Sequence, residues 1–140
     1  MAQKYIIGDL VKVWLDLDIK YQVVEVAGYD PTYQKYILTN WYIEETRGFI
    51  SVAEDKIKPI RLTRKILKKN GWNKRTRTCY DGEHLEDFSN PSFPLEHFAI
   101  TFTKEGIKAT YDCLPVREVK YVSDLQHLLF GLNINHEMEV

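Results

Sequence analysis

Basic side chains are concentrated in one stretch of the chain, from Lys56 to Arg77, and side chains of this type bind anions. The stretch holds ten lysine and arginine residues and no acidic residue. The rest of the chain holds nine basic and 20 acidic residues, which give it a net charge of −11. Lysine and arginine neutralise phosphate groups, and a basic stripe is the usual footprint of nucleic-acid binding. The stretch is therefore a candidate contact surface for nucleic acid or for another partner.

Two periodicities predict how six of these side chains are presented. In a short helix over about 64–70, four of them lie on the face opposite Ile66 and Leu67. In the strand that follows, two arginines share one side, because alternate residues of a strand point the same way. The predicted contacts with nucleic acid or a partner are Arg64, Lys65, Lys68, Lys69, Arg75 and Arg77.

The alternative is that the basic run is an ordinary solvated surface. An acidic loop over 81–87 follows it and can balance its charge, and the whole chain carries a net charge of only −1. Lysines near the end of a helix are also favoured by the helix dipole. Both observations favour this alternative over nucleic-acid binding. The acidic residues of the loop are Asp81, Glu83, Glu86 and Asp87.

Aromatic residues in the first half form a second group of candidate contacts. Tyr29, Tyr33 and Tyr42 fall in or beside predicted turns. An exposed ring in such a place either braces a sheet or anchors a binding partner. These three tyrosines are therefore candidate contacts with a protein partner.

Residue patterns typical of catalysis and of metal binding are not found in the sequence. There is no Gly-x-Ser-x-Gly, no His-Glu-x-x-His and no glycine-rich phosphate or dinucleotide loop. Cys79, His84, His97 and Cys113 are separated by 5, 13 and 16 residues, and this spacing differs from that of the usual zinc pairs. We therefore expect no enzymatic activity, no metal and no cofactor.

The short helix within the basic run is bounded by clear end signals. Thr63 is a good N-cap, because its hydroxyl can accept a hydrogen bond from a backbone N–H of the first turn. Gly71 suits the left-handed residue that ends a helix, and Trp72 can then fold back onto Leu67. Two helical turns are not stable alone in water, so Ile66 and Leu67 must dock on a larger unit.

Residues 1–60 are predicted to form a small β-barrel. Short segments of alternating apolar residues are separated by turn signals such as 28–31, a pattern typical of a small closed barrel. A first strand that opens with Gly8-Asp9-x-Val11, followed by a valine-rich strand, resembles SH3-like barrels. The predicted strands span 8–15, 21–27, 33–39, 41–45 and 48–52, and Ile57 and Ile60 close the section.

Residues 61–140 are predicted to form a separate α+β unit, a small antiparallel sheet with two short helices, so the whole chain is mainly β with α. After the first helix come strands near 75–80 and 116–122, separated by a loop over 81–94 and a hairpin over about 98–111. Ser123 and Gln126 form a capping box for a second helix over about 124–132. Residues 137–140 are predicted to add an edge strand.

Three motifs of the chain resemble those of a known family. They are Gly8-Asp9-x-Val, Ile60-x-Leu-Thr-x-x-Ile-Leu-x-x-Asn-Gly-Trp72 and Val119-Lys-Tyr-Val-x-x-Leu-Gln-His-Leu128. Together they resemble a family of small uncharacterised proteins of gut-associated bacteria and their tailed phages. This chain has Asp9, Trp72 and Ser123 where that family has Asn, Phe and His. The resemblance implies a fold and a compartment but brings no assigned activity.

The remaining features bear on compartment and function. No apolar run approaches the ~18 residues of a membrane span, and no secretory signal is visible at the start. Cys79 and Cys113 are expected to be reduced, in the host cytoplasm or in a virion. We expect a non-enzymatic interaction module or accessory protein of a phage or mobile element that binds a protein partner. The alternative is a nucleic-acid-binding adaptor that uses residues 56–77.

Overall fold

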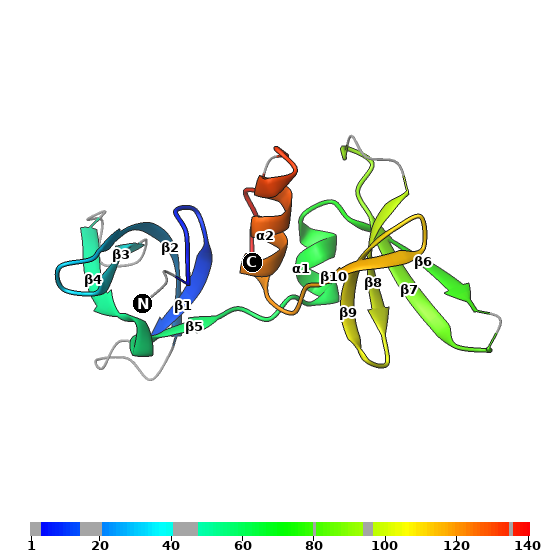
Figure 1. Ribbon diagram of the computed structural model, residues 1–140, viewed down its shortest axis with the longest axis horizontal. Helices are drawn as coiled ribbons and strands as arrows, with labels where there is room; N and C mark the ends of the chain where they lie inside the picture. The colour runs from blue at the N-terminus through cyan, green and yellow to red at the C-terminus, as the bar shows by residue number, and fades with distance from the viewer. Residues whose placement is uncertain (1–3, 15–20, 41–47, 80, 94–96, 135) are drawn as a thin grey trace. The chain divides into compact units, whose positions relative to one another are not determined.

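The structure is a computed structural model and describes residues 4–14, 21–40, 48–79, 81–93, 97–134 and 136–140. Its contacts divide the chain into two compact units, Met1–Ile60 and Arg61–Val140. Within the described residues the protein is mainly β, with two antiparallel sheets and two α-helices (Figure 1). The expected mainly β, α+β class is confirmed at this level.

The amino-terminal unit is an antiparallel sheet of five strands. In space the strands follow the order β4-β3-β2-β1-β5, and a 3-10 turn, η1, precedes β5. Over the described part of the chain no pairing joins β4 to β5, so the hydrogen bonding of this sheet is open rather than closed. The elements are β1 (Leu10–Trp14), β2 (Tyr21–Asp30), β3 (Lys35–Asn40), β4 (Gly48–Ala53), η1 (Glu54–Lys56) and β5 (Ile57–Pro59).

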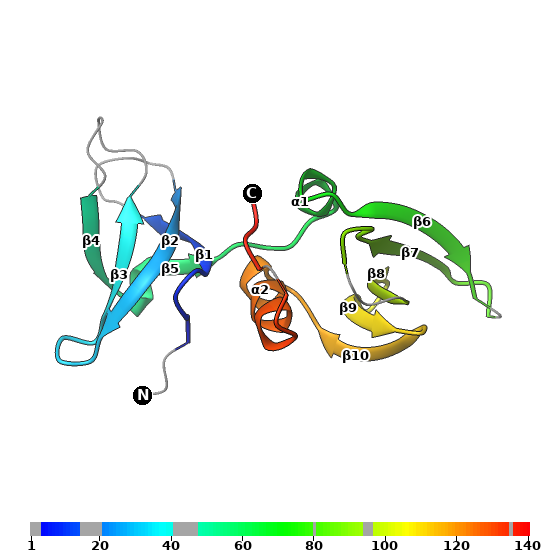
Figure 2. The same cartoon turned by 90° about the horizontal axis from the view of Figure 1, so that it is seen from above.

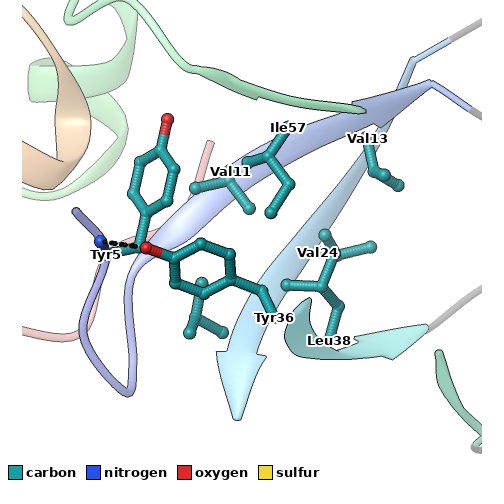
Figure 3. Close-up of a cluster of buried hydrophobic side chains, with 8 residues drawn as sticks. Tyr5, Val11, Val13, Val24, Tyr36, Leu38 and Ile57 are labelled. Carbon is teal, nitrogen blue, oxygen red and sulfur yellow. Dashed lines mark hydrogen bonds between the residues drawn. The ribbon is translucent and has the colours of Figure 1, made fainter. Parts of the chain in front are cut away.

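Alternation along the strands builds the core of this unit (Figure 3). The alternating apolar pattern expected in the first two strands is confirmed, since four valines are fully buried: Val11, Val13, Val24 and Val26. Tyr36 on β3 lies beside them, and its hydroxyl accepts hydrogen bonds from the backbone N–H groups of Lys4 (2.8 Å) and Tyr5 (3.2 Å). A buried tyrosine needs such partners for its polar end. Tyr36 therefore holds the first described residues against the sheet.

One predicted turn of this unit is wrong. Residues 28–31 were expected to form a turn, but β2 continues to Asp30 through a bulge between Val26 and Gly28. The chain reverses one step later, where the Asp30 carboxylate accepts a hydrogen bond from the Thr32 N–H at 2.9 Å and Gln34 has a φ of 53°. Gly28, which suggested a turn, lies instead at this bulge within the strand. The predicted strand over 41–45 lies outside the described residues.

The carboxyl-terminal unit combines a second five-stranded antiparallel sheet with both α-helices. Its strand order is β10-β9-β8-β7-β6, and the predicted hairpin over 98–111 is confirmed as β8 and β9. Figures 1 and 2 both show the two helices at one end of this sheet. The elements are α1 (Arg64–Lys69), β6 (Asn73–Thr78), β7 (His84–Ser89), β8 (Phe98–Thr103), β9 (Gly106–Tyr111), β10 (Leu114–Glu118) and α2 (Val122–Gly131).

The end signals predicted for α1 are confirmed. The Thr63 hydroxyl accepts a hydrogen bond from the Ile66 N–H at 3.2 Å. Gly71 has a φ of 85°, and the Trp72 N–H donates to the Leu67 carbonyl at 3.0 Å, which is the Schellman arrangement. Leu67 is fully buried and Trp72 nearly so. The short helix is thus fixed through its own termini and through its apolar side.

Three details of the carboxyl-terminal unit differ from expectation. Residues 81–94 are not one long loop, because β7 lies within them and buries Leu85 and Phe88. The second helix begins at Val122, not after Ser123, since the Asp124 carboxylate accepts a hydrogen bond from the Tyr121 N–H at 2.8 Å. Residues 137–140 do not form a strand. Polar residues concealed β7, whereas the start of α2 is set by a different local cap, formed by Tyr121 and Asp124.

Candidate functional surfaces

The first predicted contact residue, Arg64, is already engaged within the unit. Its Nε donates to Glu86 Oε2 at 2.5 Å, and its guanidinium lies 4.5 Å from the centroid of the Phe102 ring. The hydrogen bond from Arg64, supported by the charges of Lys74 and Lys68, holds the pKa of Glu86 below its ordinary value. Glu86 belongs to β7, so the acidic residue that neutralises Arg64 comes from a strand and not from the predicted loop.

Arg77 is held by a chain of polar side chains that crosses the sheet. Its Nε donates to Asp87 Oδ2 at 2.6 Å, and this hydrogen bond raises the pKa of the guanidinium. Asp87 Oδ1 accepts from the Thr101 hydroxyl at 2.7 Å, and Thr101 lies 3.0 Å from the Thr110 hydroxyl. Thr101 is fully buried. Arg77 therefore supplies a charged hydrogen-bond donor to a network whose inner members are buried.

A surface depression lies beside this network. Its volume is about 280 Å³, and the lining includes Arg75, Arg77, His97, Asp112 and Cys113. The Cys79 thiol lies 3.8 Å from Arg77 Nη1. In the described residues no group of three or more His, Cys, Asp or Glu side chains is arranged to hold a metal ion, and both cysteines are free thiols.

The other predicted basic contacts divide into two kinds. Lys69 already forms a hydrogen bond within the unit, because its Nζ donates to the main-chain oxygen of Val140 at 2.9 Å. Lys65, Lys68 and Arg75 are exposed, and no ion pair to them is found in the described ranges. Lys68 of α1 and Lys74 of β6 are both near enough to the Glu86 carboxylate for their charges to help lower its pKa. We call Lys65, Lys68 and Lys74 the helix–strand basic patch.

The three predicted aromatic contacts have different environments. Tyr29 lies in β2, half-buried, with its ring 4.9 Å from that of Tyr36, so it braces the sheet. Tyr33 lies in the turn after β2 and is 73% exposed, as a binding anchor would be. Tyr42 lies outside the described residues. Of the two alternatives for these rings, the structure favours the sheet brace for Tyr29, and its contact with a partner stays a prediction.

An exposed apolar surface on the β9–β10 hairpin was missed by the sequence analysis. Tyr111, Leu114 and Val116 are 49%, 69% and 61% exposed, and we call them the hairpin patch. Tyr111 and Leu114 are directly opposite each other in the register, and the pairing of the two strands shifts between Pro115 and Arg117. A proline between two apolar residues is typical of an edge strand, and this signal was present in the sequence.

The turn of this hairpin is made by two residues in the left-handed region. Asp112 and Cys113 have φ values of 50° and 68°. Two positive φ values match the twist of a tight two-residue hairpin, although glycine or asparagine is more usual at these positions. The turn fixes the positions of Tyr111 and Leu114 relative to each other.

Comparison of the chain with protein-family models, with curated proteins and with solved structures finds no match. None of the helices in the described ranges is long and apolar enough to span a membrane. Function is therefore inferred from the surfaces of the two units themselves.

Proposed function

We propose that the protein is a non-enzymatic interaction module that binds a protein partner through the hairpin patch. The observation that carries this proposal is the exposure of three large apolar side chains, Tyr111, Leu114 and Val116, on one hairpin. Contiguous apolar side chains at a surface mark interaction sites, because water is displaced from them when a partner binds. Tyrosine is also a frequent anchor at protein interfaces.

The register of the hairpin indicates the chemistry of the partner. Tyr111 and Ala109 lie on the same face of β9, and they are opposite Leu114 and Arg117. Leu114 and the exposed Arg117 therefore share a face of β10. A matching partner presents an apolar surface that covers Tyr111 and Leu114, with an acidic side chain at the rim to meet Arg117.

The proposed contact uses side chains and not strand addition. Pro115 has no N–H to donate, and the bulge between Pro115 and Arg117 interrupts the ladder. Proline and bulges on an edge strand hinder the pairing of a further strand. The apolar side chains of β10 remain accessible to a partner all the same.

The test compares two purified variants with the wild type. A protein that co-purifies with the tagged chain from its native host is identified, produced separately and titrated by calorimetry. Burial of an exposed Leu or Val contributes about 1.5 kcal/mol or more, so Leu114→Ser/Val116→Ser should weaken binding by at least about 100-fold. The control Lys65→Glu/Lys68→Glu should bind within about twofold of the wild type. If both variants bound the partner equally well, the proposal would be contradicted. It would also be contradicted if the wild type self-associated and Leu114→Ser/Val116→Ser abolished that self-association, because the patch would then bind a second copy of this chain.

We further propose that the amino-terminal unit is an SH3-like barrel. The support is the strand order β4-β3-β2-β1-β5, the antiparallel pairing of β5 with β1, and the 3-10 turn between β4 and β5. The resemblance of the three sequence motifs supports two related proposals: an accessory role in a phage or mobile element, and residence in the host cytoplasm or a virion. Labelling of the tagged protein in infected cells would test the location.

A second candidate function is nucleic-acid binding through the helix–strand basic patch. The observation that favours it is the exposure of Lys65, Lys68 and Lys74, together with the effect of Lys68 and Lys74 on the pKa of Glu86, which places both near that carboxylate. Three phosphate contacts would give a slope of log K against log salt concentration of about −3 for duplex DNA. Fluorescence anisotropy with duplex DNA and with single-stranded RNA measures it. Sub-micromolar binding at physiological salt that Lys68→Glu/Lys74→Glu abolishes would favour this function, and binding only in the non-specific range of ~10⁻⁴–10⁻⁶ M would exclude it.

A further inference from the structure

The last described residues of the chain are ordered by side chains of the carboxyl-terminal unit and not by a strand. We call His136–Val140 the strap. Figures 1 and 2 show it running back beside α2. Gln126 Nε2 donates to the His136 carbonyl at 3.1 Å, and Lys69 Nζ donates to the Val140 oxygen at 2.9 Å. The rings of Phe130 and His136 meet edge to face at 5.3 Å.

Asn70 holds the centre of the strap through both ends of its amide. Its Nδ2 donates to the Glu139 carbonyl at 2.7 Å, and its Oδ1 accepts from the Glu139 N–H at 2.8 Å. A neighbouring strand would offer one residue the same pair of bonds. All four hydrogen bonds go to main-chain atoms of the strap, so they recognise an extended backbone and not particular side chains.

The groups that hold the strap belong to α1 and α2 or to the residue that ends α1. Asn70 Nδ2 also donates to the Ile66 carbonyl at 2.8 Å, which places the amide at the end of α1. Gln126 is 1% exposed and lies in α2. A cavity of about 170 Å³ adjoins these groups, with Trp72, Phe93 and Leu129 in its lining and Met138 of the strap beside them. The amide of Asn70 is therefore positioned by α1 as well as by the strap, and the selectivity of the groove lies at the position of Met138.

The strap lies at the surface of the unit. The four hydrogen bonds named above and the edge-to-face contact of Phe130 with His136 act against the cost of ordering five residues. No residue of the strap is fully buried. Release of the strap is therefore easy compared with unfolding of the unit beneath it.

We propose that Lys69, Asn70, Gln126 and the adjoining cavity form a docking groove for an extended peptide, which the strap occupies within the same chain. The external ligand is an extended segment of a protein partner with an unbranched apolar residue in the place of Met138 and acidic residues beside it. The exposed Lys68 and Lys69 lie at the end of α1 beside the groove residue Asn70, and their positive charges favour such acidic residues. This groove shares no residue with the hairpin patch and goes beyond the function proposed for that patch.

The test uses the full chain with the strap disabled by Glu139→Pro. This substitution removes the N–H that donates to Asn70 Oδ1 and changes no residue of the groove. The probe is a fluorescent peptide of residues 134–140, and the matched control is the same peptide with proline at the position of Glu139. A tether holds the strap at an effective concentration on the order of 1 mM, so a peptide with a Kd of about 0.1 mM should bind the wild type about tenfold more weakly than Glu139→Pro.

The supporting result is binding of the probe to Glu139→Pro, at least about tenfold weaker binding to the wild type, and no binding of the proline peptide. The NMR signals of the Asn70 side-chain amide and the Trp72 indole should shift when the probe binds. Absence of binding to Glu139→Pro, or equal binding of both peptides, would overturn the proposal. If Glu139→Pro does not fold, a chain without residues 136–140 replaces it. Failure of that chain to fold would also overturn the proposal, because the strap would then be part of the core.

Discussion

Replacement of Thr101 by valine tests the polar network that holds Arg77. The side chain of Thr101 is fully buried, and its hydroxyl donates to Asp87 Oδ1 at 2.7 Å. Valine keeps the shape of threonine but has no hydroxyl, so the carboxylate loses one hydrogen bond and the Thr110 hydroxyl loses its neighbour, while Arg77 remains in place. We expect Thr101→Val to lower the free energy of unfolding of the carboxyl-terminal unit.

The size of the effect follows from the surroundings of Asp87. A hydrogen bond to a charged group is worth about 1.5–3 kcal/mol. The side chain of Asp87 is 17% exposed, so water can partly replace the lost donor. Removal of a buried hydroxyl also relieves some desolvation cost. The expected loss is therefore about 1–2 kcal/mol, and with a urea m-value of about 1–1.5 kcal/mol/M the midpoint should fall by about 1 M.

The assay must report on one unit, because two units can unfold in separate transitions. Trp72 is the only tryptophan of residues 61–140, so its indole N–H signal in NMR spectra follows this unit through a urea titration. The control is Thr76→Val on β6, where the residue is exposed and the change should stay within about 0.5 kcal/mol. In an Asp87→Ala background, Thr101→Val should cost about 1 kcal/mol less than in the wild type. An equal cost in both backgrounds would show that the bond to Asp87 is not the cause.

Three further predictions concern stability. Leu67→Ala and Trp72→Ala should each destabilise the carboxyl-terminal unit by about 2–5 kcal/mol, because both side chains are buried; an unchanged urea midpoint in either variant would contradict this packing. The pKa of Glu86 is lowered, so its contribution is present above its ordinary pKa and is lost as the pH falls below it. The melting temperature of the wild type should therefore fall more than that of Glu86→Gln between about pH 6 and pH 3, and parallel curves would count against the ion pair with Arg64. EDTA or a reductant should change the melting temperature by less than about 2 °C, and a larger shift would reveal a metal or disulfide contribution to folding.

Local signals in the sequence predicted the ends of α1 and the inward faces of β1 and β2. Thr63, Gly71 and Trp72 act through bonds within a few residues, so their roles follow from residue type and spacing alone. The alternation of Val11 and Val13 needs only the period of a strand.

Contacts between distant residues could not be predicted in the same way. Arg64 and Glu86 are 22 residues apart, and their ion pair depends on how α1 packs against β7. β7 was not predicted because Glu86 and Asp87 interrupt its apolar pattern. Each of these carboxylates forms an ion pair with an arginine of another element. The hairpin patch was missed because Leu114 lay outside the predicted strands, and because the sequence pattern does not tell which apolar residues of an edge strand face solvent.

The two outer strands of the carboxyl-terminal sheet differ in a way that bears on polymerisation. β6 presents Lys74, Arg75 and exposed threonines, whereas β10 presents a proline and a bulge. Stacking of copies head to tail would require β6 of one copy to pair with β10 of the next, and such a contact does not close on itself. The lysine and arginine side chains of β6 would lose hydration in that contact, and Pro115 would leave a gap in the ladder. Growth of this sheet into a filament is thereby disfavoured at both ends, even though apolar side chains stay exposed at one of them.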